Sequence, residues 1–325
     1  MRLENIDVPE ICEDFLTNTA NEMAYSTRMC YALELKTFFS WLSANEKIAG
    51  KTAAYSDLEK LSPSDISKYL VFCKDNNCAE RTIARKRATL SSYFSFLINN
   101  KYIKFNPVMG STRVKIHSSD SVNHIDIHNQ IDFLEEISSG ENLSVRQKVY
   151  HKKYFLRDYA IVLFFLDTGV RVSELHKLNI ADIDFNECFA LITRKGGNEQ
   201  HVYFSDETKG ILLEYLQYRK TFELEILNKS PLFVTLKGNR LAIRSIQKIV
   251  QKYAAASSNP DINRVTVHRL RASFAMAFYK ETKDILTLQR KLGHSSIQST
   301  NVYAKATDKT MKDTRAIMER LRKDF

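Results

Sequence analysis

Hydrophobic residues recur at three- and four-residue spacings through most of the first hundred positions, which is the period of an amphipathic helix. One such segment carries a continuous apolar stripe at Tyr31, Leu35, Phe38, Phe39 and Leu42. A third helix is predicted to begin at Ser62, which can serve as its N-cap. Pro63 suits the first turn, and the negative charge of Asp65 interacts favourably with the positive end of the helix dipole. The pattern predicts a four-helix N-terminal domain, with helices over 9–23, 26–45, 62–76 and 79–100.

The helical period breaks between residues 106 and 124, where Pro, Gly and several Ser residues are interleaved with basic residues. Helical patterns resume on the far side of this segment. We therefore expect a helical domain at 1–110, a linker at 111–123 and a second domain at 124–325.

The second half begins with a helical pattern at 125–140, a polar and basic stretch at 141–155, and an apolar helix that Gly169 is placed to stop. Two strand-like runs, 188–193 and 200–205, flank a turn with two glycines and predict a β-hairpin. Further helices are predicted at 206–228, 244–257, 266–282, 284–293, 296–306 and 307–325. The fold class is mainly α with one small hairpin.

The composition is that of an ordinary globular protein, with 44% hydrophobic and 26% charged residues among 325. A net charge of +10 suits a polyanionic partner such as nucleic acid, although it also fits a basic protein without one. We expect no signal peptide and no membrane span, and a cytoplasmic location. The cysteines are odd in number and scattered, so we expect reduced thiols rather than zinc ligands or disulfides: Cys12, Cys30, Cys73, Cys78 and Cys188.

Two short stretches before the middle of the second domain place cations where they can reach an anion. Arg171 follows the glycine stop, and Glu174 lies one turn along the next helix. Lys195 stands beside Gly196 and Gly197 at the tip of the hairpin. Taken singly, a surface ion pair and a solvated turn lysine are the simpler explanations of these two stretches. Arg194 also stands beside Lys195, which leaves the choice of this lysine more open.

Two further stretches lie near the C-terminus. His268 and Arg271 share a helix face at a three-residue spacing and can converge on one anion. His294 follows a Leu-Gly pair at a helix boundary, and Tyr303 lies on or beside the next short helix. A basic helix face and a buried tyrosine are the simpler explanations of each stretch alone.

The order of these groups closely resembles the tyrosine recombinase, or phage integrase, family. The order is Arg, Lys, His-x-x-Arg, Gly-His, Tyr, and the strings TGVRVSEL and LGHSSIQSTNVYAKA look most like its Xer-type and conjugative-element branch. The resemblance extends over the whole chain and implies a helical, SAM-like core-binding domain that binds DNA, followed by a mostly helical catalytic domain. It implies site-specific recombination of DNA through a covalent 3′-phosphotyrosyl intermediate.

The resemblance also implies a role for each site residue. Arg171 and Arg271 would bind the phosphate, since guanidinium forks match its oxygens. Tyr303 would be the nucleophile, His268 the acid/base group, Lys195 the acid at the leaving 5′-oxygen, His294 a phosphate donor and Glu174 a support for the arginines. We expect no cofactor and no metal, because neither metal-ligand spacing nor a nucleotide-binding loop occurs in the sequence.

Partners follow from the same reasoning. Four basic residues on one stretch of the fourth helix, Arg81, Arg85, Lys86 and Arg87, are candidate DNA contacts, or else a solvated basic face. The expected DNA is double-stranded, with an inverted-repeat core site. The resemblance implies a homotetramer on synapsed DNA. The amphipathic segment at 307–325 would then dock on a neighbouring protomer, or alternatively pack on its own domain.

Two other functions remain compatible with the sequence. A type IB topoisomerase uses the same kinds of residue to nick and close DNA without exchanging strands. A non-catalytic DNA-binding protein on the same scaffold is the alternative from a different class.

Overall fold

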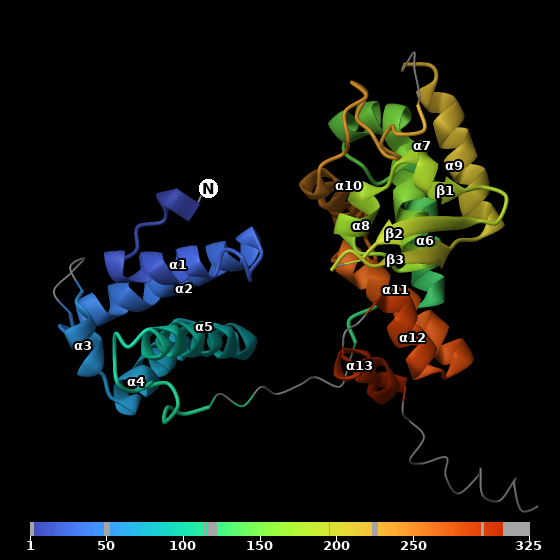
Figure 1. Ribbon diagram of the computed structural model, residues 1–325. Coiled ribbons are helices and arrows are strands. Elements are labelled where there is room, and N and C mark those ends of the chain that lie inside the picture. The colour runs from blue at the N-terminus through green and yellow to red at the C-terminus, as the bar shows by residue number, and fades with distance from the viewer. Residues whose placement is uncertain are drawn as a thin grey trace, which may run out of the picture. The chain divides into compact units, whose positions relative to one another are not determined.

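The computed structural model describes residues 3–48, 53–113, 115, 122–194, 196–222, 227–293 and 296–307. The chain separates into two compact units, Met1–Ser118 and Ser119–Phe325 (Figure 1). The division falls inside the segment 111–123. Three features predicted from the sequence lie outside the described residues: Lys195, His294 and the C-terminal segment from 308 onward.

The N-terminal unit is helical throughout its described secondary structure. Its elements are the 3-10 turns η1 (Leu3–Asn5) and η2 (Glu10–Cys12) and the helices α1 (Glu13–Asn18), α2 (Tyr25–Ala44), α3 (Tyr55–Glu59), α4 (Pro63–Asp75) and α5 (Glu80–Asn99). The predicted stripe on α2 is buried at Leu35, Phe38, Phe39 and Leu42. Aromatic rings dominate the core, where Phe38 meets the ring of Tyr69 edge-on at 5.0 Å between centroids.

Sequence patterns predicted α2, α4 and α5 closely, and the start of α4 follows from its first residues. Ser62 accepts from the Asp65 N–H while the Asp65 carboxylate accepts from the Ser62 N–H, which forms a capping box with Pro63 in the first turn. The prediction of one helix over 9–23 was wrong, because α1 ends at Asn18. Helix α3 was missed, since five residues are too few to show a period.

The second unit carries the sheet. Its elements are α6 (Ile127–Ser139), α7 (Val145–Thr168), α8 (Val172–Lys177), η3 (Ile180–Asp182), β1 (Ile183–Asp184), β2 (Phe189–Thr193), β3 (Glu199–Tyr203), α9 (Asp206–Arg219), α10 (Ile243–Ala256), α11 (Val267–Thr282), α12 (Ile285–Leu292) and α13 (Gln298–Thr307). The sheet is antiparallel in the order β1-β2-β3, with Ile192 opposite Gln200 in the predicted hairpin. The fold is therefore mostly helical with one small antiparallel sheet.

Helix α7 is the centre of this unit and packs against α6, α9 and α11 (Figure 1). Its C-terminal half contains an unbroken buried run from Ala160 to Phe165. The helix begins twelve residues before Arg157, where the sequence indicates only a polar stretch; the exposed Val145, Val149 and Tyr150 obscure the amphipathic pattern there. The predicted helix at 206–228 is also shorter, because α9 ends at Arg219.

Gly169 ends α7 in the left-handed conformation, as its place in the sequence predicts (φ 60°). A Cβ atom added there would lie 2.3 Å from the Cδ1 atom of Phe274 on α11. The carbonyl of Gly169 accepts a hydrogen bond from Arg271, also on α11. This glycine is thus required both by its backbone angle and by the close approach of α11.

Replacing Gly169 by alanine is expected to lower the free energy of unfolding by about 2–4 kcal/mol, since it combines a strained angle with an overpacked contact. Urea denaturation measures the loss. Gly210, within α9, is the matched control, because an added Cβ meets nothing within 4 Å; alanine there should stabilise the protein by about 0.5–1 kcal/mol. Equal stability of the two variants would contradict this account of Gly169.

Candidate active site

Helix α12 ends at Leu292 with Gly293 in the left-handed conformation, and the carbonyls of its last turn lack the i+4 N–H partners of the helix interior. The Gly293 N–H donates to Arg290 O, but the helix end needs further partners. Side chains from other elements supply those partners. The acceptors and donors are, in chain order, Arg290 O from Gln200 Nε2, Lys291 O from Arg194 Nη2, Leu292 O from Arg271 Nη2 and Gly293 O from Arg171 Nη2. Three guanidinium groups therefore meet at one helix end, where the helix dipole favours positive charge.

Arg171 is the N-cap residue of α8 and Glu174 lies in the first turn of that helix. The Arg171 N–H donates to Glu174 Oε2 at 2.7 Å, and its Nη1 donates to Glu174 Oε1 at 2.9 Å. The Arg171 side chain remains 36% exposed. This arginine is therefore held by Glu174 and Gly293 while its outer edge faces solvent.

Arg271 lies deeper, at 5% exposure, and bridges Gly169 and Leu292 through its two Nη atoms. Burial lowers its pKa to about 10, and the positive charge of Arg171 adds to this effect. Arg271 donates to Leu292 O and Arg171 donates to Gly293 O, so the two guanidinium groups bind adjacent carbonyls. A guanidinium has more N–H donors than these two bonds use, so both arginines retain donors for an oxyanion.

Glu174 is almost fully buried and lies between Arg171 and Arg194. Burial raises the pKa of its carboxyl, but the hydrogen bond from the Arg171 backbone and the charge of Arg194 outweigh burial, so that the pKa is lowered overall. Glu174 is consequently a carboxylate at neutral pH. From the sequence, Arg194 is only an alternative to Lys195 as the hairpin cation. Strand alternation nevertheless places Arg194 on the buried side of β2, with Ala190 and Ile192.

Tyr303 lies on α13 and packs against α11 and α12, in a small apolar cluster with Ala272, Met276, Leu288 and Leu292. It is 7% exposed. Burial raises the pKa of its phenol, and the positive charge of Arg271 partly opposes that rise. The tyrosine is thus a packed core residue that shares a cluster with Ala272, the residue after Arg271, and with Leu292.

His268 is exposed in the first turn of α11, one turn before Arg271. The structure thus brings together Arg171, Glu174, Arg271 and Tyr303, with Arg194 in addition. Lys195 follows Arg194 directly and His294 follows Gly293, so both adjoin residues of this cluster in the chain.

The predicted DNA contacts on α5 divide into two kinds. Arg81 is exposed, and the Arg85 side chain is 56% exposed although its guanidinium is bound to Glu34 Oε1. Lys86 requires correction: its side chain is 10% exposed and its ammonium lies 2.6 Å from Glu34 Oε2, so it links α5 to α2 instead of facing solvent. Arg87 is partly buried and donates to Val108 O at 2.8 Å.

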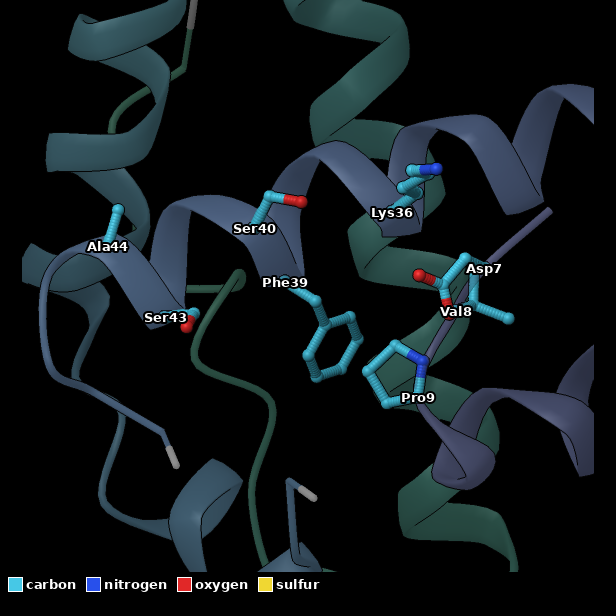
Figure 2. A pocket seen from close by; sticks show the side chains of 8 residues that line it. All are labelled: Asp7, Val8, Pro9, Lys36, Phe39, Ser40, Ser43 and Ala44. Atoms are coloured by element: carbon cyan, nitrogen blue, oxygen red, sulfur yellow. The ribbon is translucent and has the colours of Figure 1, made fainter. Parts of the chain in front are cut away.

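A hollow in the N-terminal unit lies between residues 7–9 and α2, where Figure 2 shows the Phe39 ring beside Pro9. Asp7 and Lys36 are its charged lining residues. No described helix has the length and apolar character to span a membrane. Among the described residues, no group of three or more His, Cys, Asp or Glu side chains is arranged to hold a metal ion.

Comparison with known proteins gives matches over most of the chain. The phage integrase family pattern matches residues 143–310, and that of the phage integrase N-terminal SAM-like domain matches 13–101. A tyrosine recombinase of Agathobacter rectalis is 30% identical over 92% of this chain and 92% of its own length. A tyrosine recombinase XerC of Thermodesulfovibrio yellowstonii is 28% identical over 89% of this chain and 90% of its own.

Solved structures share the fold at lower identity. The XerH site-specific recombinase bound to difH substrate aligns with a TM-score of 0.68 at 22% identity, covering 94% of this chain and 83% of that one. The Tn1549 transposon integrase in complex with a circular intermediate DNA aligns with a TM-score of 0.71 at 19% identity, covering 96% and 99%.

Removing the charge of Arg271 is expected to raise the pKa of the Tyr303 phenol further, because that charge favours the phenolate and opposes the effect of burial. The measurement is an NMR titration of protein labelled with ¹³C at tyrosine Cζ, with the signal assigned through Tyr303→Phe. In Arg271→Met the signal should begin to shift at a higher pH than in the wild type. A shift toward lower pH, with the fold intact by circular dichroism, would contradict the assigned geometry.

Proposed function

Because the chain belongs to the phage integrase family, we propose that it is a site-specific DNA recombinase that cuts and rejoins strands through a 3′-phosphotyrosyl link at Tyr303. The observation that carries the proposal is the meeting of Arg171 and Arg271 at the carbonyl end of α12, with Tyr303 packed in one cluster with Leu292, whose carbonyl accepts from Arg271. These are the groups that attack on a phosphodiester requires: fixed positive donors and a nucleophile.

The two arginines would bind the non-bridging oxygens of the scissile phosphate. Their charge is most effective on the phosphorane-like transition state, which carries more negative charge than the ground state. Because Glu174 and the carbonyls of Leu292 and Gly293 already fix both guanidinium groups, little reorganisation is needed when DNA binds.

Tyr303 would form a new bond from its phenolic oxygen to phosphorus while the bond from phosphorus to the 5′-oxygen breaks. His268 would accept the phenolic proton, and Lys195 would donate a proton to the departing 5′-oxygen. His294 would donate to the phosphate. The phosphotyrosyl ester retains the energy of the broken bond, so rejoining needs no ATP.

The relatives favour recombination over simple nicking and closing, since they carry the name tyrosine recombinase. We propose a cytoplasmic recombinase of the Xer-like or conjugative-element branch. It would act on double-stranded DNA with an inverted-repeat core site, as a homotetramer on synapsed DNA with exchange of C-terminal helices. The N-terminal unit would serve as the core-binding domain, with Arg81 and Arg85 as its phosphate contacts on α5.

Replacing Tyr303 by phenylalanine is expected to reduce covalent protein–DNA product by about 10³-fold or more while leaving DNA affinity nearly unchanged, since only the attacking oxygen is lost. Denaturing gel analysis of the protein on a nicked core-site duplex measures the product. Tyr279→Phe, in the same apolar cluster, is the matched control and should retain activity. Full activity of Tyr303→Phe would eliminate Tyr303 as the nucleophile.

Arg81→Gln and Lys86→Met should separate DNA contact from structural support on α5. Loss of one phosphate contact at Arg81 should reduce the slope of log affinity against log salt by about 1. Loss of Lys86 leaves the buried Glu34 with Arg85 alone, which should lower the urea midpoint and leave the salt slope unchanged. Fluorescence anisotropy at several salt concentrations measures the slopes; the reverse assignment of the two effects is the outcome that would refute this division.

A further inference from the structure

Arg194 has no part in the chemistry proposed above, yet it is one of the most elaborately bonded side chains of the site. It follows β2, on the side of the strand that Ala190 and Ile192 bury, and its side chain is only 7% exposed. A Cβ atom added at Gly293 would lie 2.9 Å from Arg194 Nε. The guanidinium therefore packs closely against Gly293, which precedes His294 in the chain.

Each edge of this guanidinium has a partner. Nε donates to Gln200 Oε1 at 2.9 Å, Nη1 donates to Glu174 Oε2 at 2.8 Å, and Nη2 donates to the carbonyl of Lys291. With each of its three nitrogens already bound to a partner and its side chain only 7% exposed, Arg194 is poorly placed to bind a phosphate directly. Any effect it has on the reaction must pass through its partners.

The partner that matters is Glu174, whose two oxygens are divided between the guanidinium groups of two arginines. Oε1 accepts from the Arg171 guanidinium, and Oε2 accepts from the Arg194 guanidinium and from the Arg171 backbone N–H. One negative charge is therefore shared by two positive ones, and Arg171 keeps much of its charge. If Arg194 were neutral, the same carboxylate would neutralise Arg171 in a closely bonded pair.

Burial strengthens the electrostatic interaction between Glu174 and its two arginine partners. Glu174 is 4% exposed, so water and salt screen its charge poorly. Burial lowers the pKa of Arg194, while the carboxylate of Glu174 opposes that effect and favours the charged form. The arrangement holds three guanidinium groups against one carboxylate around the site.

We propose that Arg194 is a positioning residue that keeps Glu174 from neutralising Arg171, and so preserves the positive charge that Arg171 offers to the scissile phosphate. This proposal rests on the proposed function. If Arg194 has this role, the cleavage rate depends on the net charge of Glu174 and its arginine partners. A purely structural role would make the rate depend on packing instead.

Charge balance predicts a rescue that packing does not. Arg194→Gln removes one positive charge, and adding Glu174→Gln removes the negative charge that would then neutralise Arg171. Glutamine at 174 retains an acceptor oxygen for the Arg171 N–H, as in a capping box. The double variant thus restores the net charge of the wild-type site.

The experiment measures single-turnover formation of covalent product on a nicked core-site duplex, with DNA affinity measured separately. Arg194→Gln should slow cleavage by about tenfold or more, with affinity changed by less than about threefold. The double variant Arg194→Gln/Glu174→Gln should be faster than Arg194→Gln by about threefold or more. A double variant no faster than Arg194→Gln overturns the proposal.

Arg194→Lys is a second test of the proposal, and it remains informative even if Arg194→Gln does not fold. It keeps the charge but not the fork, so cleavage should remain within about threefold of wild type. A folded Arg194→Lys protein that is tenfold slower would show that charge is not the cause, and would overturn the proposal.

Arg157→Gln is the matched control for general loss of stability. Arg157 is also buried, and its carboxylate partner Asp158 and backbone carbonyl partner Val234 do not lie on α12. Its folded protein should cleave within about threefold of wild type; an equal loss of rate would attribute the effect of Arg194→Gln to stability and overturn the proposal. Wild type and Tyr303→Phe in the same assay report on the proposed function independently of Arg194.

Discussion

The last turn of α12 presents its backbone carbonyls to side chains from α8, from α11 and from the hairpin. A helix end of this kind must find donors, because buried carbonyls without partners are costly, and its dipole favours cations. Arginine satisfies both demands at once. By binding carbonyls at one edge of each guanidinium, the helix end also fixes the direction in which the remaining donors point. The same arginines therefore satisfy the carbonyls at the end of α12 and, in the proposed reaction, offer their remaining N–H donors to the phosphate.

This construction couples the site to the whole C-terminal unit. Arg171 reaches a carbonyl 122 positions further along the chain, and Arg194 reaches one 97 positions further. Gly169 links the end of α7 to Arg271, and Glu174 ties the hairpin to α8. No single element supplies enough of these contacts to form the cluster alone. The arrangement of positive charge consequently depends on α7, α8, α11, α12 and the hairpin having packed together.

Local patterns in the sequence predicted the parts of the fold that have a strong period. The apolar stripe of α2, the capping residues of α4, the Gly169 stop and the hairpin all follow from short-range physics, and each is present. The features that the sequence did not predict depend on contacts between residues far apart in the chain. Lys86 looks like a free cation on a basic helix, and only the packing of α5 against α2 places it beside Glu34. Arg194 has the strand parity of a buried residue, but its role depends on the distant end of α12.

We propose that positive charge gathered at the end of α12 enables Tyr303 to attack DNA. The most direct measurement is mass spectrometry of the covalent protein–DNA product after nuclease digestion, which identifies the modified residue and the end of the nucleotide attached to it. We expect a nucleotide joined through its 3′-phosphate to Tyr303. A nucleotide attached to another residue, or joined through its 5′-phosphate, would contradict it.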